Sequence, residues 1–422
     1  MRCEHRGSDL SRPLASLRQL EDPVKESRRG TSSTGMPGSI HGMRVIVVTE
    51  SFHPRMDGVV RSVDMLLDHL DRHGHSALVF AAGPGPAEHG SAQVERVPGI
   101  TGLVYPDLTL SPVAPFMHAR FLRFQPDMVH LASPAALGVY AAAVARFVGI
   151  PTAAHYQTDI PSYAHRYGIA AARGLLERAE ALFHNSCTVT YAPTEEMALE
   201  LRSRGFERVR VSRRGVDAEF FRHDRPGAAA ASARWPAGEG ARILCVSRLA
   251  REKELEVLLE TARQLPSAQF LLVGQGPLDD QLRHTAPPNL QLAGPLHGDD
   301  LGDTYAAADV FAFPSRTETF GQVVQEAMAT SLPVVGMRAG GVATLVGHHR
   351  TGLLADDAEQ FTRHVAVLSG DPALRTTMGE AGRAAVLPAT WTAIHDRLLE
   401  DYAGLAADRK GRHGWTGHRS AS

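Results

Sequence analysis

Two carboxylates, Glu318 and Glu326, lie eight residues apart in the stretch FPSRTETFGQVVQEAMATSLPVV. The pattern predicts an apolar strand over 310–313, a polar turn, and a helix that begins near Phe320 or Gly321. At about 3.6 residues per turn, the first carboxylate falls in the turn and the second roughly a turn and a half inside the helix, so both could face one ligand. The N–H groups at the helix start would suit a phosphate. The competing interpretation is an amphipathic helix with an acidic cap and a solvated glutamate.

Two cations, Arg248 and Lys253, lie in the segment SRLAREK, where a predicted strand runs into a loop and then a helix. Together with the helix start near Gly321 they could hold two negative charges without a metal. The chain contains no Asp-x-Asp motif, so a bound diphosphate would be neutralised by protein cations. The other lysines, Lys25 and Lys410, fall in predicted tails, and a compact ammonium at 253 suits a phosphate oxygen. The alternative is a surface loop with solvated cations.

Polar side chains also follow an apolar run in the first half of the chain, where AAHYQTD brings together His155, Gln157 and Asp159. Side chains at such a strand end point toward the ligand-binding edge of an α/β sheet. The alternative for His155 is an interior histidine with satisfied hydrogen bonds. Gly58 opens a helix after the first strand, where glycine lets the backbone approach a ligand closely.

Glycines mark two further turns in the second half of the chain. Gly274 lies in GQGP after a predicted strand, but the GxGxxG spacing is missing, so a nicotinamide cofactor is not expected. Gly340 and Gly341 follow the predicted strand over 333–336 and are expected to form a flexible loop at the same edge.

Apolar runs alternate with helical patterns along the chain, which predicts parallel strands joined by crossover helices. The predicted strands of the first half are 44–49, 77–81, 128–131, 152–156, 188–191 and 209–212, and its helices are 59–72, 135–148, 173–184 and 194–204. A Gly, Ala and Pro-rich stretch at 226–240 precedes a second set of such elements, ARILCVS, FLLVG, VFAFPS and PVVG among its strands.

The fold class expected from this alternation is α/β, with two doubly wound Rossmann-like domains and the active site between them. The expected division is an N-terminal domain over 43–222, a C-terminal domain over 223–389, and a last helix over 390–407 that returns to the first domain. The tails, 1–42 and 408–422, are expected to be disordered. Translation is expected to begin at Met36 or Met43, since Met43 directly precedes the first strand.

Composition is that of an ordinary globular protein of 422 residues, with 43% hydrophobic and 21% charged residues. A net charge of −2 gives no sign of a nucleic-acid partner. The longest apolar stretch, 135–145, is too short to span a bilayer. Cysteines are few and odd in number, which favours a reducing, cytoplasmic compartment; they are Cys3, Cys187 and Cys245.

The segments SRLAREK, LVGQGP, FPSRTETFGQVVQEAMATSLPVVG and AGGVATLVGHHRTGLL together resemble the donor half of retaining glycosyltransferases of family 4, which have the GT-B fold. The resemblance covers nearly all of 43–406, and its E-x7-E motif is specific enough to outweigh the amphipathic-helix interpretation. SFHPRMDGVVRSV, HYQTDIPSYAHRYG and TETFGQVVQEAM look most like the GDP-mannose-dependent α-mannosyltransferases with which actinobacteria build glycolipids. UDP-sugar-dependent glucosyl, N-acetylglucosaminyl and sulfoquinovosyl transferases acting on a lipid or inositol phosphate remain alternatives.

Carried over by position, the resemblance implies that Arg248 and Lys253 bind the donor diphosphate. Glu318 would contact hydroxyls of the transferred sugar, Glu326 the ribose, and His155 would sit beside the reacting sugar. The rest of the implied donor site is formed by small residues and one aromatic residue: Gly58, Gly274, Phe320 and Gly321. Transfer would retain the anomeric configuration and need no cofactor or metal beyond the nucleotide-sugar donor.

This chain departs from the family pattern at two places. A Pro-Glu pair often follows the glycine pair, where this chain has Ala343 and Thr344. The common glycine between the first glutamate and the phenylalanine is Thr319. Neither change removes a charge assigned to the diphosphate.

Two other functions fit parts of the pattern. A sugar-nucleotide epimerase shares the fold but would need extra carboxylates around the sugar and no acceptor site. A silent binding protein is disfavoured by the joint presence of all the charged candidates. The expected partners are a nucleotide sugar and a glycolipid or small-molecule acceptor, with no prediction for oligomeric state. A lipid acceptor would require peripheral contact with the inner membrane surface, through 116–124 or 166–178, although each also fits a solvated amphipathic helix.

Overall fold

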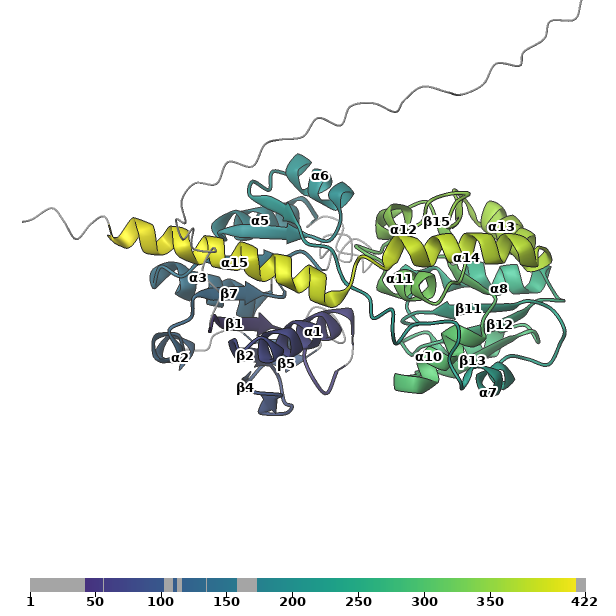
Figure 1. Ribbon diagram of the computed structural model, residues 1–422, viewed down its shortest axis with the longest axis horizontal. Helices are drawn as coiled ribbons and strands as arrows, with labels where there is room; N and C mark the ends of the chain where they lie inside the picture. Colours follow the sequence, from purple (N-terminus) through teal and green to yellow (C-terminus); the bar gives the residue numbers. More distant parts are fainter. Residues whose placement is uncertain are drawn as a thin grey trace, which may run out of the picture. The chain divides into compact units, whose positions relative to one another are not determined.

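The structure is a computed structural model that describes 42–55, 57–101, 109–111, 116–133, 135–157 and 173–414. These residues belong to one compact unit that starts at Ile40. Two large sheets form its framework, and both are built from parallel strands with helices between them (Figure 1). The fold class predicted from the sequence is confirmed.

The first sheet has eight strands in the order β10-β9-β8-β7-β1-β2-β4-β3, all parallel except the β3–β4 hairpin. Its strands are β1 (Arg44–Thr49), β2 (Ser76–Ala82), β3 (Glu88–His89), β4 (Ala92–Val97), β7 (Met128–Leu131), β8 (Thr152–His155), β9 (Val189–Ala192) and β10 (Val209–Val211). The accompanying helices are α1 (Gly58–Arg72), α2 (Phe116–Phe124), α3 (Ala136–Phe147), α5 (Arg173–Ser186) and α6 (Glu195–Ser203). A small antiparallel pair, β5 (Ile100–Thr101) and β6 (Thr109–Leu110), falls between β4 and β7 in the sequence.

The second sheet has six strands, all parallel, in the order β13-β12-β11-β14-β15-β16. Its strands are β11 (Arg242–Val246), β12 (Gln269–Val273), β13 (Leu290–Gly294), β14 (Val310–Phe313), β15 (Val334–Met337) and β16 (Gly352–Ala355). Its helices are α7 (Ala228–Ala231), η2 (Ser232–Arg234), η3 (Arg251–Lys253), α8 (Leu255–Gln264), α9 (Asp279–Thr285), α10 (Gly298–Ala307), α11 (Gln322–Ala329), α12 (Gly340–Leu345), α13 (Ala358–Gly370) and α14 (Pro372–Val386). The division of the chain into domains at 222 and 223 stays a prediction.

Strands β1 and β14 show why these runs become central strands. Every residue of β14 is buried, and in β1 only Arg44 at the start is partly exposed. A parallel strand covered by helices on both faces needs a continuous apolar run, and these two segments supply it. Helix α1 starts because Asp57 accepts hydrogen bonds from the N–H groups of Val59 and Val60, which would otherwise lack partners.

The C-terminal helix α15 (Trp391–Gly414) packs on the first sheet, where Leu398 and Tyr402 join the same apolar cluster as residues of β1 and α1 (Figure 1). It continues beyond the predicted end at 407, so the expectation that 408–422 is disordered is wrong for 408–414. The segment 408–414 reads DRKGRHG and continues no apolar pattern, so a search for apolar periodicity overlooks it. Lys410 therefore belongs to the folded part as well.

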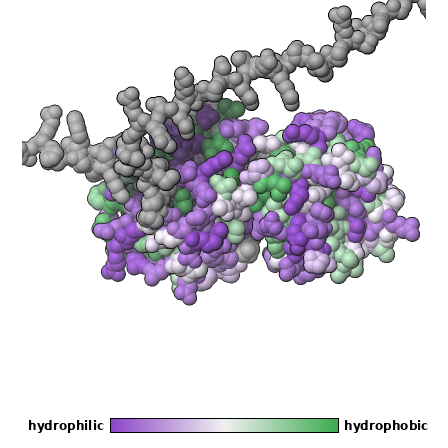
Figure 2. All heavy atoms as spheres, in the orientation of Figure 1, coloured by the Kyte–Doolittle hydropathy of each residue, from purple (hydrophilic) through white to green (hydrophobic). Residues whose placement is uncertain are grey.

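Membrane-spanning segments were searched among the described helices. None combines the length and the apolar character needed to cross a bilayer. On the face drawn in Figure 2, hydrophilic and hydrophobic residues are interspersed.

Candidate active site

Lys253 and Glu318 form an ion pair at the carboxyl edge of the second sheet. Lys253 ends the short helix η3 after β11, and Glu318 lies in the turn after β14; these strands are neighbours, so their carboxyl ends meet. Ser315 Oγ donates a second hydrogen bond to the Glu318 carboxylate at 3.3 Å. Thr317 Oγ1 donates to the carbonyl of Glu252 at 3.0 Å, which ties the two loops together. The lysine and the first glutamate predicted from the sequence are therefore adjacent.

Arg248 lies at the start of the same loop and donates to the carboxylate of Glu252. Glu252 is buried, with 2% of its side chain exposed, whereas the arginine is partly exposed. The guanidinium is therefore held along this loop by a carboxylate inside the fold. Both predicted diphosphate ligands thus contact an acidic side chain in this structure.

Glu326 is buried in helix α11, away from bulk solvent. Its carboxylate accepts a hydrogen bond from Tyr305 at 3.1 Å and pairs with Arg61 of α1 at 2.8 Å. Burial raises the pKa of this carboxyl, while the Arg61 charge and the Tyr305 hydroxyl act in the opposite direction. The second glutamate of the E-x7-E pair therefore has two protein partners, neither of which was predicted from the sequence.

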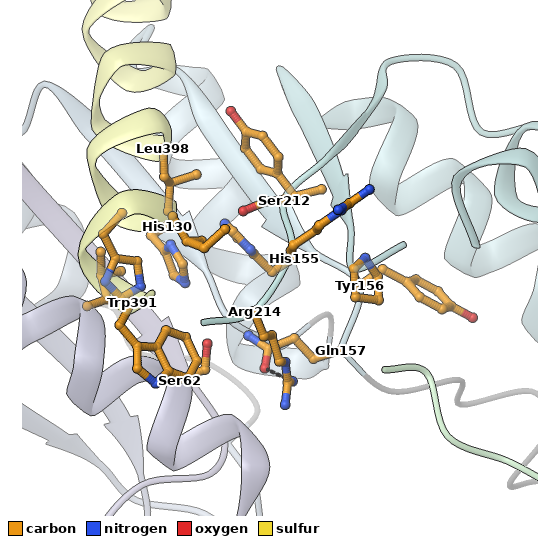
Figure 3. A pocket seen from close by; sticks show the side chains of 15 residues that line it. Ser62, His130, His155, Tyr156, Gln157, Ser212, Arg214, Trp391 and Leu398 are labelled. Atoms are coloured by element: carbon orange, nitrogen blue, oxygen red, sulfur yellow. Dashed lines mark hydrogen bonds between the residues drawn. The ribbon is translucent and has the colours of Figure 1, made fainter. Parts of the chain in front are cut away.

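His155 ends strand β8, and its ring lies in a cluster of aromatic residues under α15 (Figure 3). Its Nε2 is 3.0 Å from the hydroxyl of Tyr402, and Nδ1 of His130 is 2.8 Å from the same hydroxyl. The two imidazoles stack with centroids 4.1 Å apart. Burial lowers the pKa of His130 to about 3 and that of His155 well below its ordinary value, so both are neutral at pH 7.

Arg214, three residues after β10, is a cation of this site that sequence reasoning missed. It donates to the side chain of Gln157 at 2.7 Å and to the carbonyl of Gly58 at 3.4 Å (Figure 3). Burial lowers its pKa, and the negative charges of Glu318 and Asp57 oppose that shift. The signal was present in the sequence, because two consecutive arginines directly follow a predicted strand.

Helix α11 holds the backbone that carries this arginine. The Gln325 amide donates to the carbonyl of Arg214 at 3.2 Å, and the Gln322 amide donates to the carbonyl of Gly215 at 3.0 Å. Thr319, at the position where the family often has glycine, donates to the carbonyl of Gln157 at 3.2 Å. These contacts bring Arg214 and the turn around Glu318 together.

The small and aromatic residues of the predicted donor site occupy distinct positions. Gly58 is the first residue of α1, and Gly321 is the N-cap of α11 with φ of 93° and no side-chain cap among the described residues. Gly274 closes β12; a Cβ there would lie 1.8 Å from the carbonyl oxygen of Ser247, so only glycine allows the two loops to approach. The Phe320 side chain is buried, which leaves its backbone for any contact with a donor.

One prediction from the sequence, about Gly340 and Gly341, is wrong, and another, about Asp159, is not tested by the structure. Gly340 and Gly341 begin the helix α12 rather than a flexible loop, and the N–H of Gly341 donates to the carbonyl of Glu318 at 2.7 Å. Asp159 lies outside the described residues.

A small pocket of about 30 Å³ opens beside His155, Gln157 and Arg214 (Figure 3). It has room for water. Its walls come from α1, the ends of β7, β8, β9 and β10, and the first turns of α15. The carboxyl edge of the first sheet is therefore lined by neutral histidines and one partly buried guanidinium.

Comparison with known proteins decides the family. Residues 56–220 match the family described as "Glycosyltransferase Family 4", and 240–371 match "Glycosyl transferases group 1". A GDP-mannose-dependent alpha-mannosyltransferase of Mycobacterium tuberculosis is 37% identical over 87% of this chain and 98% of its own. The chain belongs to glycosyltransferase family 4. It is a retaining hexosyltransferase, as the sequence resemblance implied.

Other relatives include a second mannosyltransferase and a transferase of a different sugar. A GDP-mannose-dependent alpha-mannosyltransferase of Corynebacterium glutamicum is 34% identical over 87% of this chain and 90% of its own. Sulfoquinovosyl transferase SQD2 of Arabidopsis thaliana is 30% identical over 80% of this chain and 69% of its own.

Solved structures show that the fold is GT-B. Sucrose-phosphate synthase from Thermosynechococcus elongatus superposes with a TM-score of 0.72 at 21% identity, covering 87% of this chain and all of that one. Anabaena Alr3699/HepE in complex with UDP and glucose superposes with a TM-score of 0.69 at 19% identity, covering 86% of this chain and 99% of that one.

Proposed function

We propose that this glycosyltransferase moves mannose from GDP-mannose onto a glycolipid acceptor that is lipid-linked or contains inositol or a uronic acid. The observation that carries the proposal is the 37% identity to a GDP-mannose-dependent α-mannosyltransferase over nearly the whole of that relative. The charged site supports it: Lys253 pairs with Glu318, Arg248 pairs with Glu252, and the negative charge of Glu318 acts on the pKa of Arg214.

The donor diphosphate would be held by Arg248 and Lys253. In the structure each of these cations contacts a glutamate, so a diphosphate, with more negative charge than one carboxylate, would compete for them. Release of Glu318 from Lys253 would leave its oxygens to accept hydrogen bonds from hydroxyls of the sugar. The ion pair between Lys253 and Glu318 in the free protein thus holds two side chains that would both contact the donor.

The other predicted residues complete the proposed site. Gly58, Gly274 and the backbone of Phe320 and Gly321 would approach the nucleotide and its phosphates. Ribose hydroxyls would replace Arg61 at the Glu326 carboxylate, because that oxygen is paired in the present structure. His155 would lie beside the transferred sugar and, being neutral, would offer a hydrogen bond without adding charge.

The proposed reaction takes place on one face of the sugar. The bond between C1 and the diphosphate oxygen breaks while the acceptor oxygen bonds to C1 from the same side. The departing phosphate takes the acceptor's proton. Catalysis then depends mainly on stabilising negative charge on the leaving diphosphate, which Lys253, Arg248 and the N-terminus of α11 would provide without a metal ion.

Contact with a membrane surface belongs to the same proposal, because the acceptor is a lipid. Helix α5 exposes Leu175 and Leu182 at 71% and 72%, one heptad apart and so on one face. Phe147 of α3 is 80% exposed. Part of the predicted segment 166–178 lies outside the described residues, but its helical part carries the first of these leucines.

The test uses GDP-mannose, UDP-glucose and UDP-N-acetylglucosamine, each with and without a lipid extract and with EDTA present, and follows release of nucleoside diphosphate. Lipid-dependent GDP release that is lost in Lys253→Ala and Glu318→Ala supports the proposal. The matched control is Arg363→Ala, which removes an exposed cation paired with Glu359 on α13. Release only with a UDP-sugar would give the enzyme a different donor, and an isomerised donor without transfer would indicate an epimerase.

A further inference from the structure

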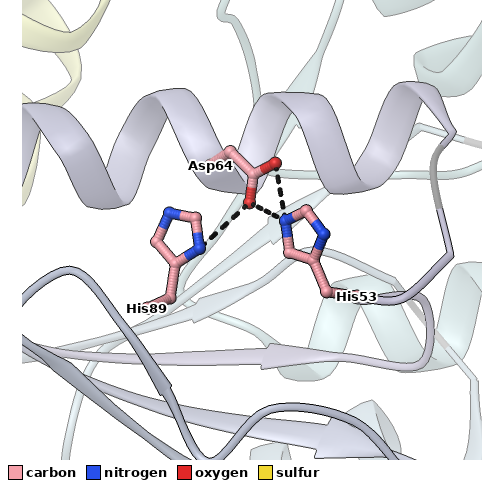
Figure 4. Close-up of side chains that lie close together, drawn as sticks. All are labelled: His53, Asp64 and His89. Carbon is pink, nitrogen blue, oxygen red and sulfur yellow. Dashed lines mark hydrogen bonds and ion pairs between the residues drawn. The ribbon is translucent and has the colours of Figure 1, made fainter.

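Two histidines and one aspartate come together on the side of α1, outside the proposed donor site (Figure 4). His53 follows β1, Asp64 lies on α1, and His89 lies on β3. Nε2 of His53 is 2.9 Å from both carboxylate oxygens of Asp64, and Nδ1 of His89 is 3.7 Å from Oδ1 of the same residue. One ligand atom from each residue lies within 4.8 Å of the others. We propose that these three residues bind a zinc ion.

The donor atoms fit this metal. Zinc takes histidine nitrogen at about 2.0–2.1 Å and carboxylate oxygen at about 2.0–2.2 Å in tetrahedral geometry, which separates neighbouring ligand atoms by about 3.3 Å. The separations of 2.9 and 3.7 Å in the structure lie on either side of that value, so small side-chain rotations would close the site. Three protein ligands leave the fourth position to water. Two imidazoles and one carboxylate disfavour magnesium or calcium, which prefer oxygen ligands.

The second nitrogen of His89 supports a metal more than a simple ion pair. Nε2 is 3.6 Å from Oδ1 of Asp68, one helical turn after Asp64 on α1. The ring is therefore placed with one nitrogen toward the shared aspartate and the other toward a second carboxylate. In metal sites, a carboxylate that accepts the outer N–H of a histidine fixes its orientation and raises its basicity.

The backbone at His53 is held firmly in place. Arg96 Nη2 donates to its carbonyl oxygen at 2.9 Å. A Cβ on Gly85 would lie 2.2 Å from the same oxygen, so this approach requires glycine. The ring of Phe52 packs at 5.0 Å from His53 and 5.8 Å from His89. The ligands are thus partly ordered before a metal arrives, which lowers the entropy cost of binding.

Burial at the site is intermediate. The exposed fractions are 24% for His53, 13% for Asp64 and 23% for His89, so the carboxylate is sheltered while the imidazoles reach the surface. A zinc ion could therefore enter from solvent. It would join the loop after β1, which leads to Gly58 at the start of α1, to the β3–β4 hairpin at the edge of the sheet. Zinc binding at this place does not depend on the proposed donor.

One other grouping of this kind exists among the described residues, formed by His69, His73 and Asp396. It differs in burial, because the ring of His69 is enclosed while the other two side chains are exposed. Arg72 also raises the positive potential there, as its effect on the pKa of His69 shows. This grouping supplies the control for the test.

The test is zinc titration of the metal-stripped full chain, followed by competition with a coloured chelator. We expect one equivalent to bind, and the affinity to fall 100-fold or more in His53→Gln and Asp64→Asn. Asp68→Asn should weaken binding about 10-fold, as expected for an outer-shell carboxylate. His73→Ala should bind zinc like the parent. Circular dichroism establishes that each variant is folded.

Two further readouts make the result decisive. Cobalt(II) added in place of zinc should give the visible absorption of a tetrahedral site, and this should be absent in Asp64→Asn. Saturating zinc should raise the melting temperature of the parent by about 2 °C or more, with no rise in that variant. Absence of binding, or binding lost in His73→Ala and retained in His53→Gln and Asp64→Asn, would overturn the proposal.

Discussion

Replacement of Tyr402 by phenylalanine tests how His155 is held. The Tyr402 ring is fully buried in α15, and its hydroxyl lies 2.8 Å from Nδ1 of His130 and 3.0 Å from Nε2 of His155. A hydroxyl has one proton, so it donates to one imidazole and accepts from the other. The two neutral histidines must therefore adopt complementary tautomers, which the single hydroxyl imposes. Tyr402→Phe removes both hydrogen bonds and keeps the ring.

The size of the effect follows from the number of groups left without partners. Each neutral hydrogen bond contributes about 0.5–1.5 kcal/mol net, and an unsatisfied buried polar group costs about 1–3 kcal/mol. Two nitrogens are affected, one of them a donor, so we expect the free energy of unfolding to fall by about 2–4 kcal/mol. His155 would also lose its hydrogen bond to α15. We therefore expect kcat to fall about 10-fold, with little change in KM for the donor.

Urea unfolding and steady-state kinetics measure the two effects separately. Tyr140→Phe on α3 is the matched control, because the structure shows no hydrogen bond from that hydroxyl to another described residue. A Tyr402→Phe protein within about 0.5 kcal/mol of the parent and with unchanged kcat would refute the argument. Loss of stability with unchanged kcat would keep the hydrogen-bond geometry and remove the role given to His155.

Three further outcomes are expected. Arg214→Met should lower kcat/KM at least 10-fold with little loss of stability, checked by kinetics beside a thermal melt; unchanged kinetics would remove Arg214 from the site. Arg61→Met should destabilise the fold by about 1–3 kcal/mol. The loss should be smaller than for a fully buried pair, because the Arg61 side chain is 32% exposed. In a double-mutant cycle, adding Glu326→Gln should recover part of that loss. Stability should fall as the pH drops from about 6.5 toward 3, because burial lowers the pKa of both His130 and His184 to about 3 and only the unfolded chain then takes up protons. Each histidine should contribute about 2 kcal/mol of loss by pH 5, and equal urea midpoints at pH 7 and pH 5 would contradict this.

The central strands could be predicted from the sequence because their signal is local. The bounds of β1 match the predicted 44–49, and α11 begins at Gln322, one or two residues after its predicted start near Phe320 or Gly321. Each is defined by an unbroken apolar run or by a glycine before a helix, and neither depends on distant contacts. The family resemblance rests on the same segments, which explains why fold and family could be predicted together.

The edge of the first sheet could not be predicted in the same way. Strand β4 reads AQVERV, half of it polar, and the edge strand β3 has only two residues. Beyond Ala92 and Gln93, which pair with β3, β4 has a neighbour only on the β2 side. Strands at a sheet edge need less apolar surface, so composition does not distinguish them from loops. His89 reaches Asp64 from this polar edge. The proposed zinc site could therefore not be predicted from the sequence, for which we expected no metal ligands.

The charged site likewise contains some contacts that could be predicted from the sequence and others that could not. Lys253 and Glu318 follow neighbouring strands, and the rule that parallel strands end at one edge is enough to place them together. Arg214 and Arg61 obey no such rule, because their partners lie far away in the chain: Arg214 contacts Gln157, 57 residues before it, and Arg61 pairs with Glu326. An arginine beside a strand end is common, and its meaning depends on which buried carboxylate it faces. The pairing of Arg61 with Glu326 therefore bears most on the proposed function: if Glu326 takes the ribose, as the family motif implies, donor binding would have to break that pair.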